Sequence, residues 1–280
     1  MVAILLALIA GVTALAWIQA QRTPEGRPDY VALGSSFAAG AGLGTLQDGS
    51  PLLCARSING YPQQLAHIRK LPNVDMSCGG AVTKQLLDGG QFFQGPQIRT
   101  IRPQTRLVTI TVGGNDVGYI GDLQMLAARN SNSLFGLLVK RFWGGPKSPA
   151  QRDYAKVQGD LVALLRAIHD RAPNAKVVVA TYPTILPPAG TCPQLRLSDG
   201  EAELMRQVGN QLASVTRAAA KQEGAILVDM HTLGAKHHAC SASPWTKGST
   251  NLSKAPFHPT LAGAKATAAM ISQALDHQQL

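Results

Sequence analysis

The sequence lacks several features that would place it in other classes of protein. Its four cysteines include no Cys-x-x-Cys pair, which argues against a zinc site. No basic run alternates with aromatic residues, so the net charge of +10 does not indicate nucleic-acid binding. The scattered Lys and Arg residues form a solvated basic surface or attract an anionic membrane or cell-envelope surface, and the first is favoured. No internal repeat or low-complexity linker divides the chain, and we expect a monomer.

The first 26 residues are set apart from the domain at residues 27–280. Residues 2–18 carry no charge and have no polar face, unlike a buried helix, and polar, turn-rich residues follow. Two interpretations stay open: an export signal with small residues Ala14 and Ala16 for cleavage, or a single membrane anchor. In either case we expect residues 27–280 outside the cytoplasm, secreted or held at the outer face of the membrane.

Short apolar segments alternate with helical ones along the domain. Strands are predicted at residues 30–33, 74–78, 107–112, 176–181 and 225–230, and helices at 61–70, 152–171, 199–222 and 260–275. This alternation predicts a three-layer α/β sandwich with a central parallel sheet of about five strands. Residues 131–150 are less regular, and a cap, a membrane-touching segment and a plain surface helix all remain open.

The four cysteines fit an exported protein with two disulfide bonds. An even number of cysteines in such a chain allows three pairings. We favour Cys54–Cys78 and Cys192–Cys240, because each pair closes a segment between strands near the carboxyl edge of the sheet.

Polar and glycine-rich segments follow the predicted strands at their carboxyl ends. Open parallel sheets bind ligands at this edge. The segments are Gly34-Ser35-Ser36, Cys78-Gly79-Gly80-Ala81, Gly113-Gly114-Asn115-Asp116 and, before the last helix, Phe257-His258-Pro259.

These segments resemble the sequence blocks of the SGNH family of serine esterases and lipases, also called GDSL. The matches are Gly34-Ser35-Ser36 with Gly40 for the first block, Gly80 for the second, Gly113–Asp116 for the third and His258-Pro259 for the fifth. They occur in family order, and the paired cysteines resemble an exported actinobacterial branch. The resemblance implies a flavodoxin-like α/β fold and ester hydrolysis without a metal or organic cofactor.

The residue chemistry agrees with the resemblance. Ser36 is the expected nucleophile and His258 the base that removes its proton. The amides of Ser36 and Gly80 and the side-chain amide of Asn115 are the expected oxyanion donors. Asp116 is expected to hold its own loop.

Two positions depart from the family pattern. Ser35 replaces the aspartate beside the nucleophile, and Ala255 stands where the family has the aspartate that orients the histidine. We expect a backbone carbonyl, that of Ala255 itself, to accept the His258 Nδ1 proton. A distant acid such as Asp229 is the alternative.

The sequence therefore predicts an exported serine hydrolase that cleaves small-molecule or lipid acyl esters. Two other functions stay open. One is an acyltransferase or acetyl-esterase acting on envelope glycans or lipids with the same residues. The other is a catalytically inactive binding domain, which the two departures would favour.

Overall fold

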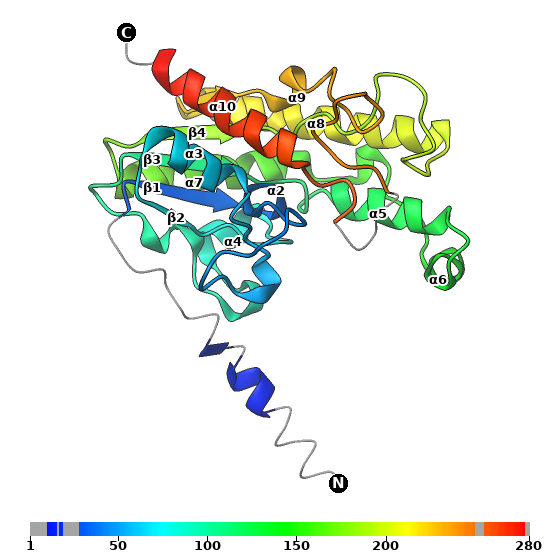
Figure 1. Cartoon of the computed structure of the whole chain (residues 1–280), viewed down its shortest axis with the longest axis horizontal. Coiled ribbons are helices and arrows are strands. Elements are labelled where there is room, and N and C mark those ends of the chain that lie inside the picture. The colour runs from blue at the N-terminus through cyan, green and yellow to red at the C-terminus, as the bar shows by residue number, and fades with distance from the viewer. Residues whose placement is uncertain (1–9, 16, 19–27, 250–254, 278–280) are drawn as a thin grey trace.

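A parallel sheet of five strands forms the centre of the protein (Figure 1). The computed structural model describes residues 10–15, 17–18, 28–249 and 255–277. The strands are β1 (Tyr30–Gly34), β2 (Asn73–Asp75), β3 (Leu107–Thr111), β4 (Lys176–Ala180) and β5 (Ile226–Val228). Their spatial order is β2-β1-β3-β4-β5, and every neighbouring pair is parallel. The order changes direction between β1 and β3, which is where open α/β sheets bind ligands.

Helices cover both faces of this sheet. They are α2 (Ser36–Ala39), α3 (Tyr61–Arg69), α4 (Thr83–Asp88), α5 (Tyr119–Arg129), α6 (Leu134–Phe142), α7 (Tyr154–Arg171), α8 (Asp199–Gln222), α9 (Met230–Leu233) and α10 (Leu261–His277). Short 3-10 helices lie between them: η1 (Leu52–Cys54), η2 (Gln91–Phe93), η3 (Gln97–Thr100) and η4 (Pro149–Gln151).

Alternate residues of β1 serve two separate cores, because successive side chains of a strand point to opposite faces. Tyr30 and Ala32 belong to the core shared with α3 and α10. Val31 and Leu33 belong to the larger core shared with α4, α5, α7 and α8. Every residue of β1 is buried, so this strand lies at the centre of the sandwich.

The predicted α/β sandwich is confirmed, with five strands at the expected places. The four predicted helices correspond to α3, α7, α8 and α10. Residues 131–150, left open by the sequence, contain the surface helix α6. Helices α2, α4, α5 and α9 were not predicted.

The predicted leader at residues 1–26 falls mostly outside the described residues. Its described parts, residues 10–15 and 17–18, are helical and expose their side chains. In the described part of the chain, no helix combines the length and the apolarity that crossing a membrane requires.

Candidate active site

The turn after β1 presents Ser36 at the carboxyl edge of the sheet. Gly34 has a φ of +143°, and a Cβ at this position would overlap the carbonyl oxygen of Thr111, so only glycine fits. The side-chain amide of Gln97 accepts from the Gly34 amide at 2.9 Å and donates to its carbonyl at 3.0 Å. Ser36 follows as the first residue of α2, and only 7% of its surface is exposed.

His258 meets Ser36 across 222 positions of sequence. Its Nε2 lies 2.8 Å from the Ser36 hydroxyl oxygen, and its Nδ1 lies 2.9 Å from the Pro256 carbonyl oxygen. A carbonyl can only accept, so Nδ1 carries the ring proton. Nε2 is then unprotonated and accepts the hydrogen of the Ser36 hydroxyl. This is the tautomer that a general base for Ser36 requires.

The carbonyl at His258 Nδ1 belongs to Pro256. The prediction from the sequence, the carbonyl of Ala255, was wrong. The Ala255 carbonyl instead accepts from the His258 backbone amide at 3.4 Å and closes the turn. Ala255 and Phe257, on either side of Pro256, are both in the left-handed region, at φ +52° and +62°. Asp229 is not at this site, because Arg217 binds its carboxylate at 3.0 Å.

An aromatic side chain packs against the imidazole of His258, which is buried. The Phe37 ring lies 5.3 Å from the His258 ring and 4.3 Å from the Tyr182 ring, centroid to centroid. Burial disfavours the imidazolium and lowers the pKa of His258 from 6.5 to about 4, although the bond to Pro256 opposes this. His258 is therefore neutral, and available as a base, throughout the neutral range.

If His258 acts as the base, we expect the acid limb of the activity profile to lie near pH 4, because protonation of Nε2 would then abolish activity. The measurement is kcat/KM for a soluble short-chain ester from about pH 3.5 to 8. A limb centred near the ordinary histidine value of 6.5 would contradict this.

Folding stability must be followed in the same series, because the unfolded state binds this proton more readily than the folded one. The difference between 6.5 and about 4 corresponds to about 3 kcal/mol. That stabilisation is complete above pH 6.5 and is lost as the pH falls toward 4. Circular dichroism at each pH separates lost activity from lost fold.

Two of the three predicted oxyanion donors, Asn115 and Gly80, lie in turns that contact each other. Asn115 Nδ2 donates to the Ala81 carbonyl at 2.9 Å, which joins the loop after β3 to the turn after β2. One hydrogen of that NH₂ group remains for another acceptor. Gly80 has a φ of +80°, and a Cβ built on it would have Gln91 Nε2, at 3.6 Å, as its nearest neighbour. Within the described residues, the backbone amides of Ser36 and Gly80 have no protein acceptor.

Asp116 holds a neighbouring element rather than only its own loop. Both of its carboxylate oxygens accept from the Thr83 amide at 3.0 Å, at the amino end of α4. Partial burial raises the pKa of Asp116. The carboxylate therefore fixes α4 against the loop that carries Asn115.

Ser35 takes part in the support of the site through a residue that the sequence did not single out. The Ser35 hydroxyl lies 2.6 Å from the hydroxyl of Tyr182, which follows β4. Desolvation raises the pKa of Tyr182, so its phenol stays neutral. The position of Tyr182 just beyond a strand was a usable signal. Gln97 and Pro256 gave none, since Gln97 acts from a distant 3-10 helix and Pro256 acts only through its carbonyl.

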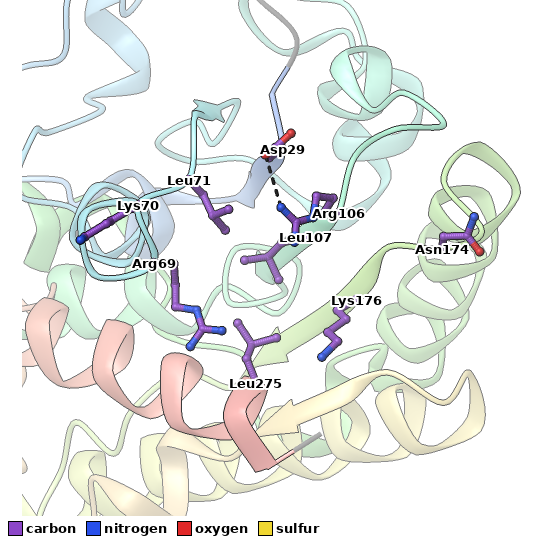
Figure 2. A pocket seen from close by; sticks show the side chains of 9 residues that line it. All are labelled: Asp29, Arg69, Lys70, Leu71, Arg106, Leu107, Asn174, Lys176 and Leu275. Atoms are coloured by element: carbon purple, nitrogen blue, oxygen red, sulfur yellow. Dashed lines mark ion pairs between the residues drawn. The ribbon is translucent and has the colours of Figure 1, made fainter. Parts of the chain in front are cut away.

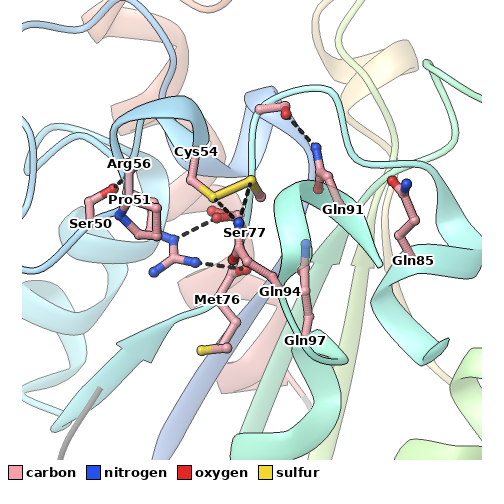
Figure 3. The surroundings of a disulfide bond; sticks show 12 residues. Ser50, Pro51, Cys54, Arg56, Met76, Ser77, Gln85, Gln91, Gln94 and Gln97 are labelled. Atoms are coloured by element: carbon pink, nitrogen blue, oxygen red, sulfur yellow. Dashed lines mark hydrogen bonds between the residues drawn. A yellow bond between two sulfur atoms is a disulfide. The ribbon is translucent and has the colours of Figure 1, made fainter. Parts of the chain in front are cut away.

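The structure contains the two disulfide bonds favoured from the sequence, Cys54–Cys78 and Cys192–Cys240. Figure 3 shows the first, with Gln94 Nε2 lying 2.9 Å from Cys54 Sγ. The Cys54 carbonyl accepts from the Gly79 amide at 2.9 Å, and Gln91 Nε2 donates to the Gly79 carbonyl at 2.7 Å. This disulfide therefore supports the turn that contains Gly80.

A basic cavity of about 440 Å³ lies at the opposite edge of the sheet (Figure 2). Lys176 and Leu107 begin β4 and β3, and Asp29 precedes β1 and pairs with Arg106 at 3.7 Å. Because this is the amino edge of the strands, the cavity is separate from Ser36 and His258.

Known proteins resemble this chain along most of its length. The model of the GDSL-like lipase/acylhydrolase family matches residues 32–266. A lipase of Streptomyces rimosus is 30% identical over 237 residues, covering 84% of this chain and 82% of that protein. Lipase 2 of Streptomyces coelicolor is 32% identical over 262 residues, covering 88% and 84%.

Solved structures show the same similarity. The extracellular lipase of Streptomyces rimosus superimposes with a TM-score of 0.68 at 27% identity, covering 88% of this chain and 98% of that one. Phospholipase A1 of Streptomyces albidoflavus NA297 gives a TM-score of 0.67 at 26% identity, covering 89% and 98%.

Proposed function

The chain belongs to the GDSL-like lipase/acylhydrolase family and is a carboxylic ester hydrolase, and on this premise we propose that Ser36 and His258 cleave acyl esters through an acyl-enzyme. The observation that carries the proposal is the 2.8 Å hydrogen bond between the Ser36 hydroxyl and His258 Nε2. It joins a potential nucleophile to an unprotonated ring nitrogen at the carboxyl edge of the sheet.

In the first half of the reaction, Ser36 Oγ attacks the ester carbonyl while its proton moves to His258 Nε2. The tetrahedral intermediate collapses as His258 gives that proton to the departing alcohol. Water then attacks the acyl-enzyme, transfers a proton to His258 and releases the carboxylic acid, which regenerates Ser36. The Pro256 carbonyl stabilises the transient imidazolium through Nδ1, as a neutral dipole in place of a carboxylate.

The oxyanion of each tetrahedral intermediate is assigned to three donors: the amides of Ser36 and Gly80 and the side chain of Asn115. The unoccupied amides and the bond from Asn115 to the turn beside Gly80 support this assignment. Such donors act mainly on the transition state, because they are aligned before the charge develops.

Lipid esters are the proposed substrates, and the proposed site of action is outside the cytoplasm. The named activities of the Streptomyces relatives support the substrate class. The two disulfide bonds, the apolar residues 2–18 and the extracellular S. rimosus lipase support export, with residues 1–26 as signal or anchor and residues 27–280 as a monomeric catalytic domain.

A fluorophosphonate probe tests the proposal, because it reacts covalently only with an activated serine. We expect labelling of the full chain at Ser36, located by mass spectrometry, and no labelling after Ser36→Ala. An unlabelled wild-type protein would favour the inactive binding domain. Incubation of a labelled acyl ester with water alone and with added sugar acceptor separates hydrolase from acyltransferase, since only a transferase moves the acyl group to the sugar.

A further inference from the structure

Helix α6 exposes its large apolar residues instead of burying them. These residues form what we call the α6 face: Leu134, Phe135, Leu137, Leu138 and Phe142. Between 50% and 77% of each is accessible, with Leu138 lowest and Phe142 highest. Soluble proteins do not usually gather so many exposed large apolar side chains on one short helix.

The packing of α6 on α5 fixes this orientation. The residues turned inward are the small ones, Gly136 and Val139. A Cβ on Gly136 would overlap the carbonyl oxygens of Ala128 and Ser131, so the close approach of the two elements requires glycine. The Ser133 hydroxyl accepts from the Gly136 amide at 3.0 Å and caps the helix. The large residues therefore point outward because the side of α6 that carries Gly136 is packed against α5.

Positive charge accompanies the α6 face. No acidic residue occurs between Asp122 and Asp153, whereas Lys140, Arg141 and Lys147 do. Lys140 and Arg141 are exposed, and in the described part of the chain neither makes a salt bridge. An apolar face edged by basic side chains complements the acyl chains and anionic headgroups of a lipid surface.

Helix α6 stands beside the half of the site that contains the base. Gln124 of α5 donates to the Pro256 carbonyl at 3.3 Å, the same oxygen that binds His258 Nδ1. Ala128, against which α6 packs, is four residues further along α5, or about 6 Å along the axis. Figure 1 shows α5 and α6 extending from the end of the sheet where α2 lies.

A second exposed apolar group adjoins the turn that contains Gly80. Leu52 and Leu53 in η1 are 78% and 61% exposed, and Phe92 in η2 is 43% exposed. Cys54 and Gln91, which bond to Gly79, belong to the same two 3-10 helices. Exposed apolar side chains thus lie on the helix packed against α5, which bonds to the Pro256 carbonyl, and on the two 3-10 helices that bond to Gly79.

We propose that the α6 face docks on an anionic phospholipid surface and brings Ser36 to ester bonds of lipids in that surface. This inference rests on the proposed ester hydrolysis by Ser36 and His258. Docking buries the apolar side chains and places Lys140 and Arg141 at the headgroups. The aggregated lipid is then a better substrate than a dissolved ester.

The test compares vesicles with a soluble ester, using the full chain throughout. Substrates are phosphatidylglycerol vesicles and monomeric p-nitrophenyl acetate. We expect Leu137→Ser/Leu138→Ser to lower the vesicle rate by about tenfold or more, because each exposed leucine loses its transfer into lipid. The rate on the soluble ester stays within about twofold, since neither residue contacts Ser36 or His258.

Matched variants separate the α6 face from general apolarity. Leu138→Ser removes a side chain that is 50% exposed, and Ile68→Ser on α3 removes one that is 48% exposed. We expect Leu138→Ser to lower the hydrolysis rate on vesicles by about threefold or more, and Ile68→Ser to lower it by less than about twofold. Lys140→Glu/Arg141→Glu lowers the rate on phosphatidylglycerol but not on phosphatidylcholine vesicles, because the lost attraction is electrostatic.

Equal vesicle rates for wild type and Leu137→Ser/Leu138→Ser would overturn the docking proposal. A wild-type dimer that this variant converts to a monomer in sedimentation would also overturn it, because a second copy would then cover the face. If the wild type fails on the soluble ester, the proposed function is what fails. Vesicle flotation, which needs no turnover, then tests docking directly. We expect the wild type to bind phosphatidylglycerol vesicles more than Leu137→Ser/Leu138→Ser does, and equal binding would overturn the docking proposal.

Discussion

Ser36→Ala is expected to reduce kcat for a short p-nitrophenyl ester by at least about 10⁴-fold while the protein stays folded. The reason is that the proposed acyl-enzyme cannot form without the Ser36 Oγ. Residual turnover comes only from binding and the oxyanion donors. The measurement is steady-state hydrolysis, with circular dichroism and thermal unfolding compared between the variant and the wild type.

Ser35→Ala is the matched control, because it removes a neighbouring hydroxyl of the same turn. Ser35 is fully buried, and its only side-chain partner among the described residues is the Tyr182 hydroxyl, at 2.6 Å. We expect a loss of stability of about 1 kcal/mol and a change in kcat of less than about tenfold. Wild-type-like turnover by Ser36→Ala would remove Ser36 from the mechanism. Equal losses in both variants would mean that the turn, and not the hydroxyl at 36, matters.

The sequence predicted the elements whose patterns are local. Each strand is a short apolar run, and α8 begins where Ser198 and Glu201 form a capping box. Helix α4 has only six residues, and its first amide donates to the carboxylate of Asp116, 33 positions away, which periodicity does not reveal. In α6 the usual pattern is inverted, with the large apolar residues outside, so the side that packs could not be identified from periodicity.

The candidate site follows the same division. Ser36, Gly80 and Asn115 were singled out because they lie at strand ends, and His258 because of the family's order of blocks. The carbonyl at His258 Nδ1 was placed one residue too early, because the sequence does not show that Ala255 and Phe257 adopt positive φ in this turn. Burial sets the low pKa of His258, and a sequence does not state how an imidazole is enclosed. The parts of the site that depend on backbone dihedral angles or on packing can therefore be identified only from the structure.

His258→Gln is the second substitution with a very large expected effect, again at least about 10⁴-fold in kcat. Glutamine is similar in size and can hydrogen-bond to Ser36, but it cannot accept the proton at any pH used for the assay. The acid limb near pH 4 should disappear with the histidine, because the group that titrates there is gone. His67→Gln, at an exposed position on α3, is the control and should leave both kcat and the pH profile unchanged.

The double variant Ser36→Ala/His258→Gln decides whether the two residues act as one unit. His258 has no role in proton transfer once the Ser36 hydroxyl is absent, so the double variant should be no slower than Ser36→Ala alone. Independent contributions would instead multiply and give a loss near the product of the two single losses. A His258→Gln variant that kept its acid limb and most of its turnover would place the base elsewhere. The 2.8 Å contact with Ser36 would then be a structural hydrogen bond in a buried turn.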